Sequence, residues 1–489
     1  MGKKYGFILF LFSFSISLFA NEVKIYQTPK EVKQSKDYKI KINGMKNFVY
    51  DSQVAAFTYF SFEGKINVEV ETTFDVKWVD IRPISKNISF SYTNHLIKFT
   101  LDKPVNLSLE LNGESSRPLY IFANPPEKEI PDSTNPNVLY FRKGKIYNKG
   151  VIKLKSNQTV YVEGGAVLQC AMVAEEVEDI NILGRGIIDG SIWKYNRQQS
   201  NYVKQKMMVF KNSKNINIKG VVIVDSPGWT MKFKDCNNIK IDNIKHVNWK
   251  YGSDGIDLVS TSDVSIKNSF LRDNDDNITI KSWGGKLKYS DEQIVGSDVK
   301  NILVENCVLW NMTWGNALEI GFELRCEKVS DIIFRNIDII HVERSAAISI
   351  HNGDYATVEN ILYENINIED AQHKLIDFGV FISQYSTDRE QNEEERTKRY
   401  LHGAWDGVQD VKYYGKKKHA KYRGKIRNII FKNIKVVGGK IPFSLMVGYN
   451  DEHNIENVTF ENLEFYGKKI TNVKDAKLYL EYADNIKFK

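Results

Sequence analysis

Hydrophobic and polar residues alternate with a period of two in the first part of the chain, between residues 21 and 130. Ile66, Val68 and Val70 alternate with polar neighbours, and residues 107–112 repeat the pattern. Alternation of this kind buries one face of a strand and leaves the other face in water. Several short strands at such spacing are typical of an antiparallel β-sandwich, which we expect over residues 21–130.

A proline-rich stretch ends this pattern, and a repeated phrase follows it. Pro125 and Pro126 fix the backbone and donate no hydrogen bonds, so they mark a linker. Beyond them, an Asn or Asp followed by strand-forming residues and a closing Asn or Gly recurs, with starts at Asn215, Asn238, Asp263, Asn301, Asp331, Asn360, Asn428 and Asn457. Near-regular repetition without helical periodicity predicts the stacked coils of a parallel β-helix over residues 131–489, with Asn and Asp ladders at its corners.

One interval of the repeat is much longer than the others and predicts an insertion at residues 371–425. Insertions in a stacked array become loops on one face, which is commonly the binding face. Trp405 stands in this stretch among other aromatic and basic residues that suit sugar rings and anionic groups. The alternative is a surface flap with ordinary solvated charge.

Acidic residues are densest within residues 251–280, at Asp254, Asp275 and Asp276. Asp254 and Asp275 are 21 residues apart, about one coil, so they should lie on neighbouring coils. Carboxylates held this close cannot ionise independently, so one should keep a proton while another stays charged. This pairing suits glycosidic hydrolysis, in which a carboxyl separation of roughly 6.5 to 9.5 Å leaves room for an attacking water. A Ca²⁺ cluster and a solvated Asp ladder are the alternatives.

Composition and charge limit the kinds of partner that the protein is expected to bind. The formal net charge of +7 is modest for 489 residues, which favours an anionic polysaccharide as much as a nucleic acid, and we expect no nucleic-acid partner. The four cysteines lack the spacing of a metal site, so we expect buried core thiols, with a disulfide left open. We also expect no cofactor and no metal.

Residues 1–20 predict a secretory signal peptide, because Lys3 and Lys4 precede an apolar run that ends at Ala20. The protein should therefore be secreted or periplasmic. An uncleaved membrane anchor is the alternative, and no later segment is long and apolar enough to span a bilayer.

Three segments carry a resemblance to a known family: residues 224–244 (VDSPGWTMKFKDCNNIKIDNI), GSDGID from Gly252 and NDD from Asn274. Together they resemble the glycoside hydrolases of family 28, the polygalacturonases, which are right-handed β-helices. The resemblance implies an inverting hydrolase. It implies that Asp275 is the general acid and that Asp254 and Asp276 hold and deprotonate the water.

The chain also departs from that family. Gly315-Asn316-Ala317 stands where polygalacturonases have Gly-His-Gly, and Ser349-Ile350-His351 stands where they have Arg-Ile-Lys. The cationic pair that would grip a uronate is therefore missing, so a neutral or sulfated glycan is expected rather than pectin. A sandwich followed by a β-helix is similar to family 49, the dextranases and isopullulanase.

Six further residues are expected to bind substrate: Trp229, Lys281, Asn316, Glu319, His351 and Trp405. Trp229 suits the floor of a sugar subsite, with core packing as its alternative. Lys281 follows the acid pair and suits either lowering a neighbour's pKa or binding an anion. Glu319 has a ladder role as its alternative.

Three functions fit these residues. A polysaccharide hydrolase is favoured. A polysaccharide lyase would use Ca²⁺ and a Lys or Arg base on a uronate, and a non-catalytic solenoid would bind glycans through its carboxylates. β-Helices serve all three functions, so the fold alone does not choose among them.

Overall fold

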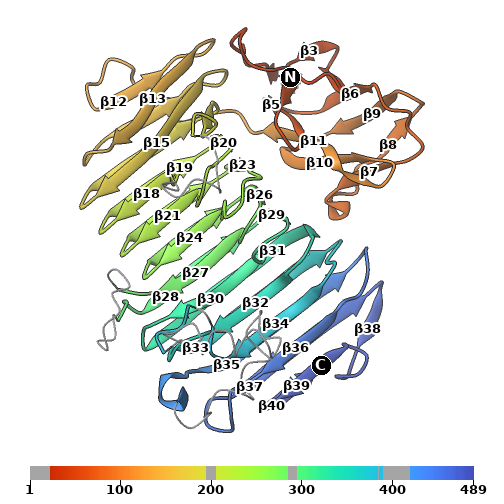
Figure 1. Ribbon diagram of the computed structural model, residues 1–489. Coiled ribbons are helices and arrows are strands. Elements are labelled where there is room, and N and C mark those ends of the chain that lie inside the picture. Colours follow the sequence, from red (N-terminus) through yellow and green to blue (C-terminus); the bar gives the residue numbers. More distant parts are fainter. Residues whose placement is uncertain (1–21, 194–204, 285–294, 384, 389–418) are drawn as a thin grey trace, which may run out of the picture.

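The computed structural model describes residues 22–193, 205–284, 295–383, 385–388 and 419–489. The predicted signal peptide at 1–20 and Trp405 lie outside these residues. Figure 1 shows an N-terminal sandwich in red and orange beside a long stack of coils that runs to the C-terminus. The residues that the structure describes include two 3₁₀ turns, η1 (Ile84–Lys86) and η3 (Ala420–Tyr422). Among the described residues no helix has the length and apolar character needed to cross a membrane.

The N-terminal part is a sandwich of two sheets, with strand orders β1-β5-β11-β10-β7, where β4 pairs with β5, and β3-β2-β6-β9-β8. The strands are β1 (Glu22–Lys24), β2 (Tyr38–Ile42), β3 (Met45–Asn47), β4 (Tyr50–Asp51), β5 (Ala56–Glu63), β6 (Ile66–Thr72), β7 (Val79–Arg82), β8 (Phe90–Tyr92), β9 (Leu96–Leu101), β10 (Val105–Leu111) and β11 (Glu114–Asn124). Ile66, Val68 and Val70 are buried between the sheets, as their alternation predicted. Strands β5 and β11 pair in parallel, so the antiparallel prediction is wrong for this pair.

The described residues from 138 onward form a parallel β-helix, in which 29 strands belong to one continuous sheet. One face contains β12 (Val138–Phe141), β14 (Thr159–Val162), β16 (Glu178–Gly184), β19 (Lys214–Lys219), β22 (Asn237–Asp242), β25 (Ser262–Lys267), β28 (Val299–Glu305), β31 (Lys328–Val342), β33 (Thr357–Ile368), β35 (Lys425–Val436), β37 (Ile455–Phe465) and β40 (Ala483–Phe488). A second face contains β17 (Ile187–Asp189), β20 (Val222–Val224), β23 (Lys245–Val247), β26 (Phe270–Asp273) and β29 (Val308–Asn311).

The third face of the helix carries the site described below. It contains β18 (Met208–Lys211), β21 (Met231–Lys234), β24 (Ile256–Val259), β27 (Ile278–Ser282), β30 (Leu318–Leu324), β32 (Ala346–Asn352), β34 (Lys374–Val380), β36 (Phe443–Val447) and β39 (Leu478–Glu481). Strands β13 (Ile146–Lys153) and β15 (Val167–Glu175) pair with each other in the first coils, and β38 (Lys468–Ile470) pairs antiparallel with β37. Strand β34 lies inside the stretch 371–425, so the coil continues into the predicted insertion.

Asparagines at the corners stabilise the stack, as the repeats predicted. The side-chain amide of Asn365 donates to Asn336 Oδ1 at 3.0 Å, and that of Asn433 donates to Asn365 Oδ1 at 2.9 Å. All three have φ of 54°. Asn tolerates this left-handed conformation better than most residues, so each corner turns the chain and adds a ladder hydrogen bond.

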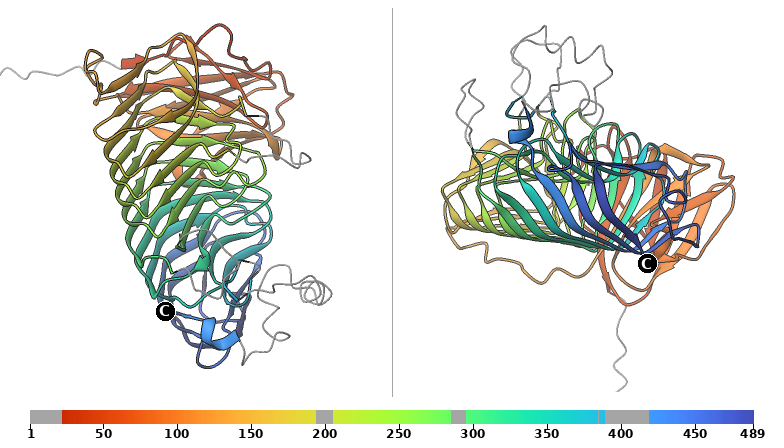
Figure 2. Two further views of the ribbon diagram at one scale, coloured as in Figure 1. Left: turned by 60° about the vertical axis from the view of Figure 1, so that its left-hand side comes forward. Right: turned by 90° about the horizontal axis from the view of Figure 1, so that it is seen from below.

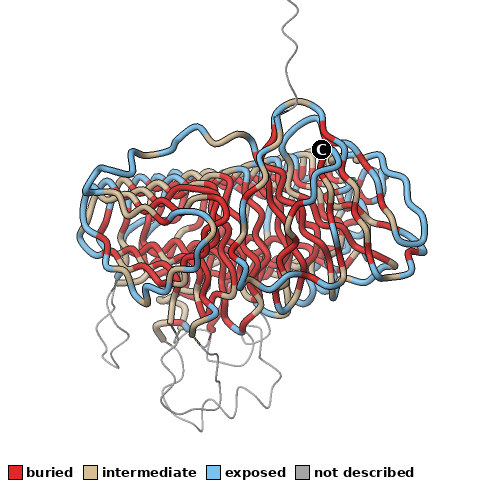
Figure 3. The backbone as a smooth tube through the Cα atoms, turned by 90° about the horizontal axis from the view of Figure 1, so that it is seen from above, coloured by how far each residue is buried: buried red, intermediate tan, exposed pale blue. Residues whose placement is uncertain are grey.

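The interior of the helix is a continuous apolar core, which Figure 3 shows as buried residues along the whole stack. Aromatic rings stack from coil to coil with centroids 4.8 to 5.0 Å apart, in the order Phe334, Tyr363, Phe431, Phe460 and Phe488. All four cysteines are buried free thiols, which confirms the core role expected for them.

The sandwich packs against the second face of the helix. Tyr120 and Phe122 of β11 contact Phe270, with ring centroids 4.9 and 5.2 Å apart, and Tyr120 also meets Trp310 at 5.7 Å. These residues belong to one buried cluster that joins the two parts. Figure 2 shows the sandwich lying along one side of the coils, away from the C-terminal end.

Buried ion pairs reinforce this junction. Arg82 Nη1 lies 2.7 Å from Glu369 Oε2, and His341 Nε2 lies 3.1 Å from Glu110 Oε2. Burial alone would lower the pKa of His341, but its contacts with Asp370 and Glu110 raise it to about 9. The junction therefore holds a charged histidine at neutral pH.

Candidate active site

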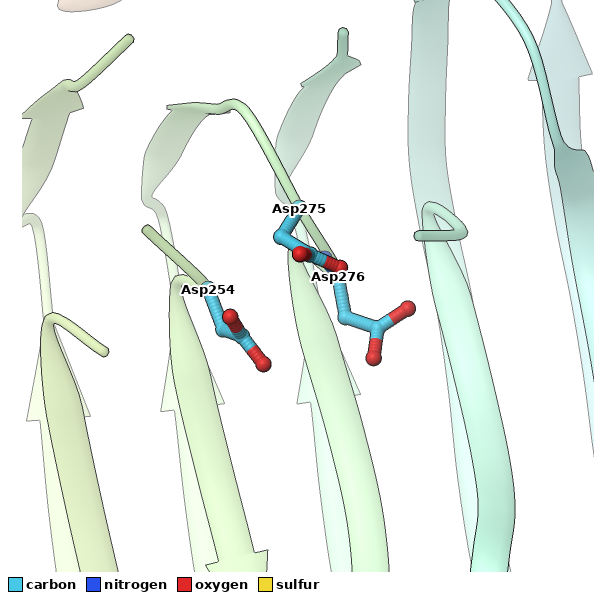
Figure 4. Close-up of side chains that lie close together, drawn as sticks. All are labelled: Asp254, Asp275 and Asp276. Carbon is cyan, nitrogen blue, oxygen red and sulfur yellow. The ribbon is translucent and has the colours of Figure 1, made fainter. Parts of the chain in front are cut away.

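Asp254 and Asp276 occupy equivalent positions on neighbouring coils. Each stands two residues before its strand, β24 and β27, and the first residues of these strands, Ile256 and Ile278, are paired. The amide of Gly255 donates to the carbonyl of Asp276 at 2.7 Å, which fixes this register. Coil stacking therefore brings together side chains from two turns of the chain (Figure 4).

Asp275 completes a compact group of acids. One carboxylate oxygen from each of Asp254, Asp275 and Asp276 lies within 4.8 Å of the others. Asp254 and Asp276 are buried, whereas Asp275 is half-buried. The backbone amide of Asp276 donates to Asp275 Oδ1 at 3.1 Å, so the turn itself orients the acid pair. The sequence-based prediction that all three converge is confirmed.

The separation of the carboxyl groups differs from the expected one. Their nearest oxygens lie within 4.8 Å, which is shorter than the roughly 6.5 to 9.5 Å that opposed carboxyl groups need around a water. That range describes an acid and a base that face each other across a substrate, and its application to these acids stays a prediction. They instead project side by side from adjacent turns.

Gly315 permits this close packing. A Cβ atom at this position would lie 2.2 Å from the Asp276 amide nitrogen and 2.5 Å from Asp275 Oδ1. The φ of Gly315 is also +65°, a conformation that side chains disfavour. The next residue, Asn316, donates its backbone amide to Asp276 Oδ1 at 2.7 Å. A side chain at 315 would displace the acid pair.

The electrostatics of the acids favour a shared proton. Burial, with added repulsion from Asp275 and Asp257, raises the pKa of Asp254 well above its usual range. Burial also raises the pKa of Asp276 well above its usual range, against the opposing effect of Lys281. The group therefore retains protons to a higher pH than isolated aspartates.

Lys281 supplies the balancing positive charge. Its Nζ lies 4.0 Å from an oxygen of Asp254, 4.0 Å from one of Asp276 and 3.6 Å from Asp257 Oδ1. Burial alone would lower the pKa of Lys281, but Glu323 and these carboxylates raise it well above its usual range. Lys281 therefore stays charged and lowers the pKa of its acidic neighbours, one of the two roles expected for it.

Asp257 was not singled out as a site residue by the sequence. Its side chain is completely buried on β24, and burial raises its pKa to about 7, although Lys281 opposes the shift. It pairs with Lys281 beneath the three acids, so it positions that lysine. Asp257 follows Asp254 by three residues within a strand-like segment, and this position in the sequence could have identified it as a site residue.

Asn316, Glu319 and His351 form a hydrogen-bonded group next to Asp276. All three are buried, and the Asn316 side-chain amide donates to Glu319 Oε2 at 2.9 Å. His351 Nδ1 lies 3.0 Å from the same oxygen, and His351 Nε2 lies 3.2 Å from Asp377. These contacts give the three residues a supporting role beside the acid pair, and the substrate contacts expected of them stay a prediction.

Two other acidic residues near the cluster are structural. Asp273 is buried and accepts hydrogen bonds from Asn248 at 2.9 Å and from Asn277 at 3.1 Å, which braces the turn before β27. Asp263 is a corner residue that accepts from Asn301 at 2.9 Å. Of the acidic residues near the cluster, Asp263 is the one that takes the role of a corner ladder residue.

Trp229 lies one coil before Asp254. It precedes β21 by two residues, as Asp254 precedes β24, and the first residues of these strands, Met231 and Ile256, are paired. Its ring is half-buried, and the ammonium groups of Lys206 and Lys281 lie 4.3 and 4.7 Å from its centroid. The sequence did not single out Lys206, because nothing in its spacing shows that it faces Trp229.

Exposed aromatic side chains stand close to the acids in the chain or in charge contact with them. Tyr251 and Trp314, both partly exposed, meet edge to face with centroids 5.5 Å apart. Tyr385 is exposed, and burial of its hydroxyl with the charges of Glu323 and Asp275 raises its pKa to about 12. Exposed rings beside carboxylates are surfaces on which sugar rings stack.

The three acids also form the arrangement that a metal ion would need. Ca²⁺ takes six to eight oxygen ligands. The Lys281 ammonium lies 4.0 Å from two of the three carboxylates and would repel a divalent ion there. The donor set therefore fits a lysine-balanced acid cluster better than a cation site.

A parallel β-helix with clustered aspartates beside exposed aromatic rings is the arrangement of a glycoside hydrolase. The sequence model of the glycosyl hydrolases family 28 matches residues 130–400, which is more than half of the 489 residues. The chain belongs to this family. No curated protein matches the sequence.

Solved structures are similar to this chain at low sequence identity. Dex49A from Penicillium minioluteum aligns over 95% of this chain and 96% of its own, with a TM-score of 0.54 and 13% identity. An exopolygalacturonase from Thermotoga maritima aligns over 68% and 84%, with a TM-score of 0.47 and 17% identity. A polygalacturonase from Erwinia carotovora aligns over 70% and 86%, with a TM-score of 0.45 and 16% identity.

Proposed function

We propose that this protein is a secreted, inverting glycoside hydrolase that cleaves a polysaccharide with Asp254, Asp275 and Asp276. The observation that carries the proposal is the convergence of their carboxylate oxygens within 4.8 Å on the outer surface of one helix face. The half-buried Asp275 is the most accessible of the three, which suits contact with a substrate.

Asp275 protonates the glycosidic oxygen as the bond breaks. A partly exposed acid reaches the leaving group, as a general acid must. The proton given to the leaving oxygen is replaced from solvent after the sugar departs. This role agrees with the one that the NDD motif implies.

Asp254 and Asp276 hold the attacking water. Their nearest oxygens lie within 4.8 Å of each other, a span that one water bridges with two hydrogen bonds of about 2.8 Å. The pair takes a proton from the water as it attacks the anomeric carbon. Support for inversion comes from the family motifs, since the carboxyl separation does not provide it.

The substrate is proposed to be a neutral or sulfated glycan rather than pectin. Ser349 and His351, which replace the arginine and lysine of the Arg-Ile-Lys segment, are both buried and engaged by Glu319. Neither side chain is therefore free to form an ion pair with the carboxylate of a uronate. Residues 1–20 support export, because they combine Lys3 and Lys4 with an apolar run.

The experiment is an Asp275→Asn variant tested against a panel of polysaccharides. Release of reducing ends should be lost while binding survives, because the acid is removed and its shape is kept. Asp263→Asn is the matched control, since Asp263 is an exposed corner residue and an asparagine keeps one of the two ladder bonds that it accepts from Asn301 and Asn237, so this variant should keep full activity. Full turnover by Asp275→Asn would refute the assignment, and an unsaturated, ultraviolet-absorbing product would indicate a lyase.

A further inference from the structure

Lysine side chains gather on the coils that precede the three acids. The ammonium groups of Lys206 and Lys232 lie 4.3 and 5.3 Å from the centroid of the Trp229 ring. Lys232 and Lys234 lie 4.6 and 5.1 Å from the centroid of Trp283. Lys206, Lys232 and Lys234 are named the lysine cluster here. It lies outside the catalytic group yet on the same face of the helix.

The register explains why these lysines lie together. Val209 of β18 pairs with Lys232, and Lys232 pairs with Asp257 of β24. Lys206 and Trp229 stand two residues before β18 and β21, as Asp254 does before β24, so they share one row. The lysine cluster is thus one to two coils from Asp254, roughly 5 to 10 Å away.

The charge of this region is incompletely balanced. Lys234 pairs with Asp235 at 2.5 Å, but no carboxylate among the described residues lies within ion-pair distance of Lys232. Burial and the nearby Lys206 lower the pKa of Lys232 to about 8, and Asp257, its partner on the next strand, opposes this shift only in part. Crowded, partly buried ammonium groups repel one another, so a bound anion would stabilise them.

We propose that the lysine cluster binds a sulfate ester carried by the substrate, on a sugar next to the one that is cleaved. The inference rests on the proposed function, because it places a second part of the same glycan. Trp229 and Trp283 provide ring surfaces for that sugar, and the ammonium groups surround its anionic group.

The residue types favour a sulfate over a uronate carboxylate. Arginine presents a planar fork that matches a planar carboxylate, and the described part of this cluster contains lysines only. Ammonium groups are point charges that approach a tetrahedral anion from several directions. The indole Nε1 of Trp283 is buried and has no hydrogen-bond partner among the described residues, so it provides a further donor at the same place.

The test measures binding in the absence of turnover. Asp275→Asn protein is titrated with dextran sulfate, carboxymethyl dextran of equal substitution and unmodified dextran, at fixed ionic strength, and the change in tryptophan fluorescence reports binding. We expect dextran sulfate to bind at least tenfold more tightly than either other polymer. Equal binding of carboxymethyl dextran would overturn the assignment to sulfate, and equal binding of unmodified dextran would overturn the anion site.

Variants locate the site. Lys232→Met in the same background should weaken binding of dextran sulfate about tenfold. Lys240→Met is the matched control, because Lys240 is exposed on β22 of the same coil but on another face, and its binding should be unchanged. Equal losses in the two variants would show general attraction to a basic surface and overturn the proposal. Lys206→Gln repeats the test if Lys232→Met fails to fold.

The readout separates this inference from the proposed hydrolysis. Binding by the lysine cluster needs no cleavage, so loss of sulfate selectivity leaves the three-acid hydrolase intact. Conversely, sulfate-selective binding by a protein that releases no reducing ends from any glycan would retain the anion site and refute the hydrolase.

Discussion

The carboxylates of Asp254 and Asp276 lie on neighbouring coils, and the Lys281 ammonium is 4.0 Å from an oxygen of each. Burial raises the pKa of both aspartates, and Lys281 lowers it. This balance decides the pH at which the pair becomes able to accept a proton from water.

Lys281→Met should shift the rising limb of the pH profile of kcat/KM to higher pH, by about one unit or more. The base must be anionic, so activity rises with pH through its pKa. Removing the lysine removes the charge that lowers that pKa. Lys240→Met should leave the profile unchanged, and an unshifted profile in Lys281→Met would contradict the electrostatic role of this lysine.

Gly315→Ala should reduce kcat by about 100-fold or more, because the new methyl group meets the Asp276 amide nitrogen at 2.2 Å and misplaces the acid pair. Gly467→Ala is the control. Gly467 has a similar φ of +74° but nothing within 4 Å of its Cβ position, so that variant isolates backbone strain. If both variants lose the same activity, the steric account of Gly315 is wrong.

The junction between sandwich and helix should weaken as pH rises. The pKa of His341 in the folded protein is raised to about 9, compared with about 6.5 in the unfolded chain. Its stabilising contribution is therefore complete below about pH 6.5 and disappears as pH rises through 9. His341→Gln should lower the melting temperature most near pH 6 and least near pH 9.5. A deficit that is constant between these pH values would contradict this reasoning.

Tyr363→Phe should stabilise the protein by about 1 kcal/mol. The ring is completely buried in the interior stack, and its hydroxyl has no hydrogen-bond partner among the described residues. Tyr59→Phe should have the opposite effect, since the Tyr59 hydroxyl accepts a hydrogen bond from the Gly165 amide at 3.1 Å. Chemical denaturation compares the two, and destabilisation by Tyr363→Phe would show that its hydroxyl is satisfied.

The repeats and the acids were predictable from the sequence for a common reason. Corner residues such as Asn365 recur at coil length, and Asp254 and Asp276 differ by about one coil, so simple spacing places them in rows. The residue types that favour the corner turns are also the ones that form the ladders. Both requirements therefore appear in the sequence as the same regular spacing.

The rest depends on contacts that spacing does not encode. Glu319 and His351 are residue types that often line a cleft. In the structure their side chains are buried and hydrogen-bond to each other. Lys206 and Lys232 meet around Trp229 because β18 and β21 pair on two neighbouring coils, and no sequence motif marks this meeting. The parallel pairing of β5 with β11 likewise follows from tertiary packing, because alternation alone is the same in either direction.

The most direct measurement of the central claim is a proton NMR time course of the first product from a cleaved glycan. A water held by Asp254 and Asp276 and a proton given by Asp275 predict a reducing end whose anomeric configuration is opposite to that of the bond cleaved, with no alkene signals. A product of retained configuration, or one with an unsaturated end, would contradict the account.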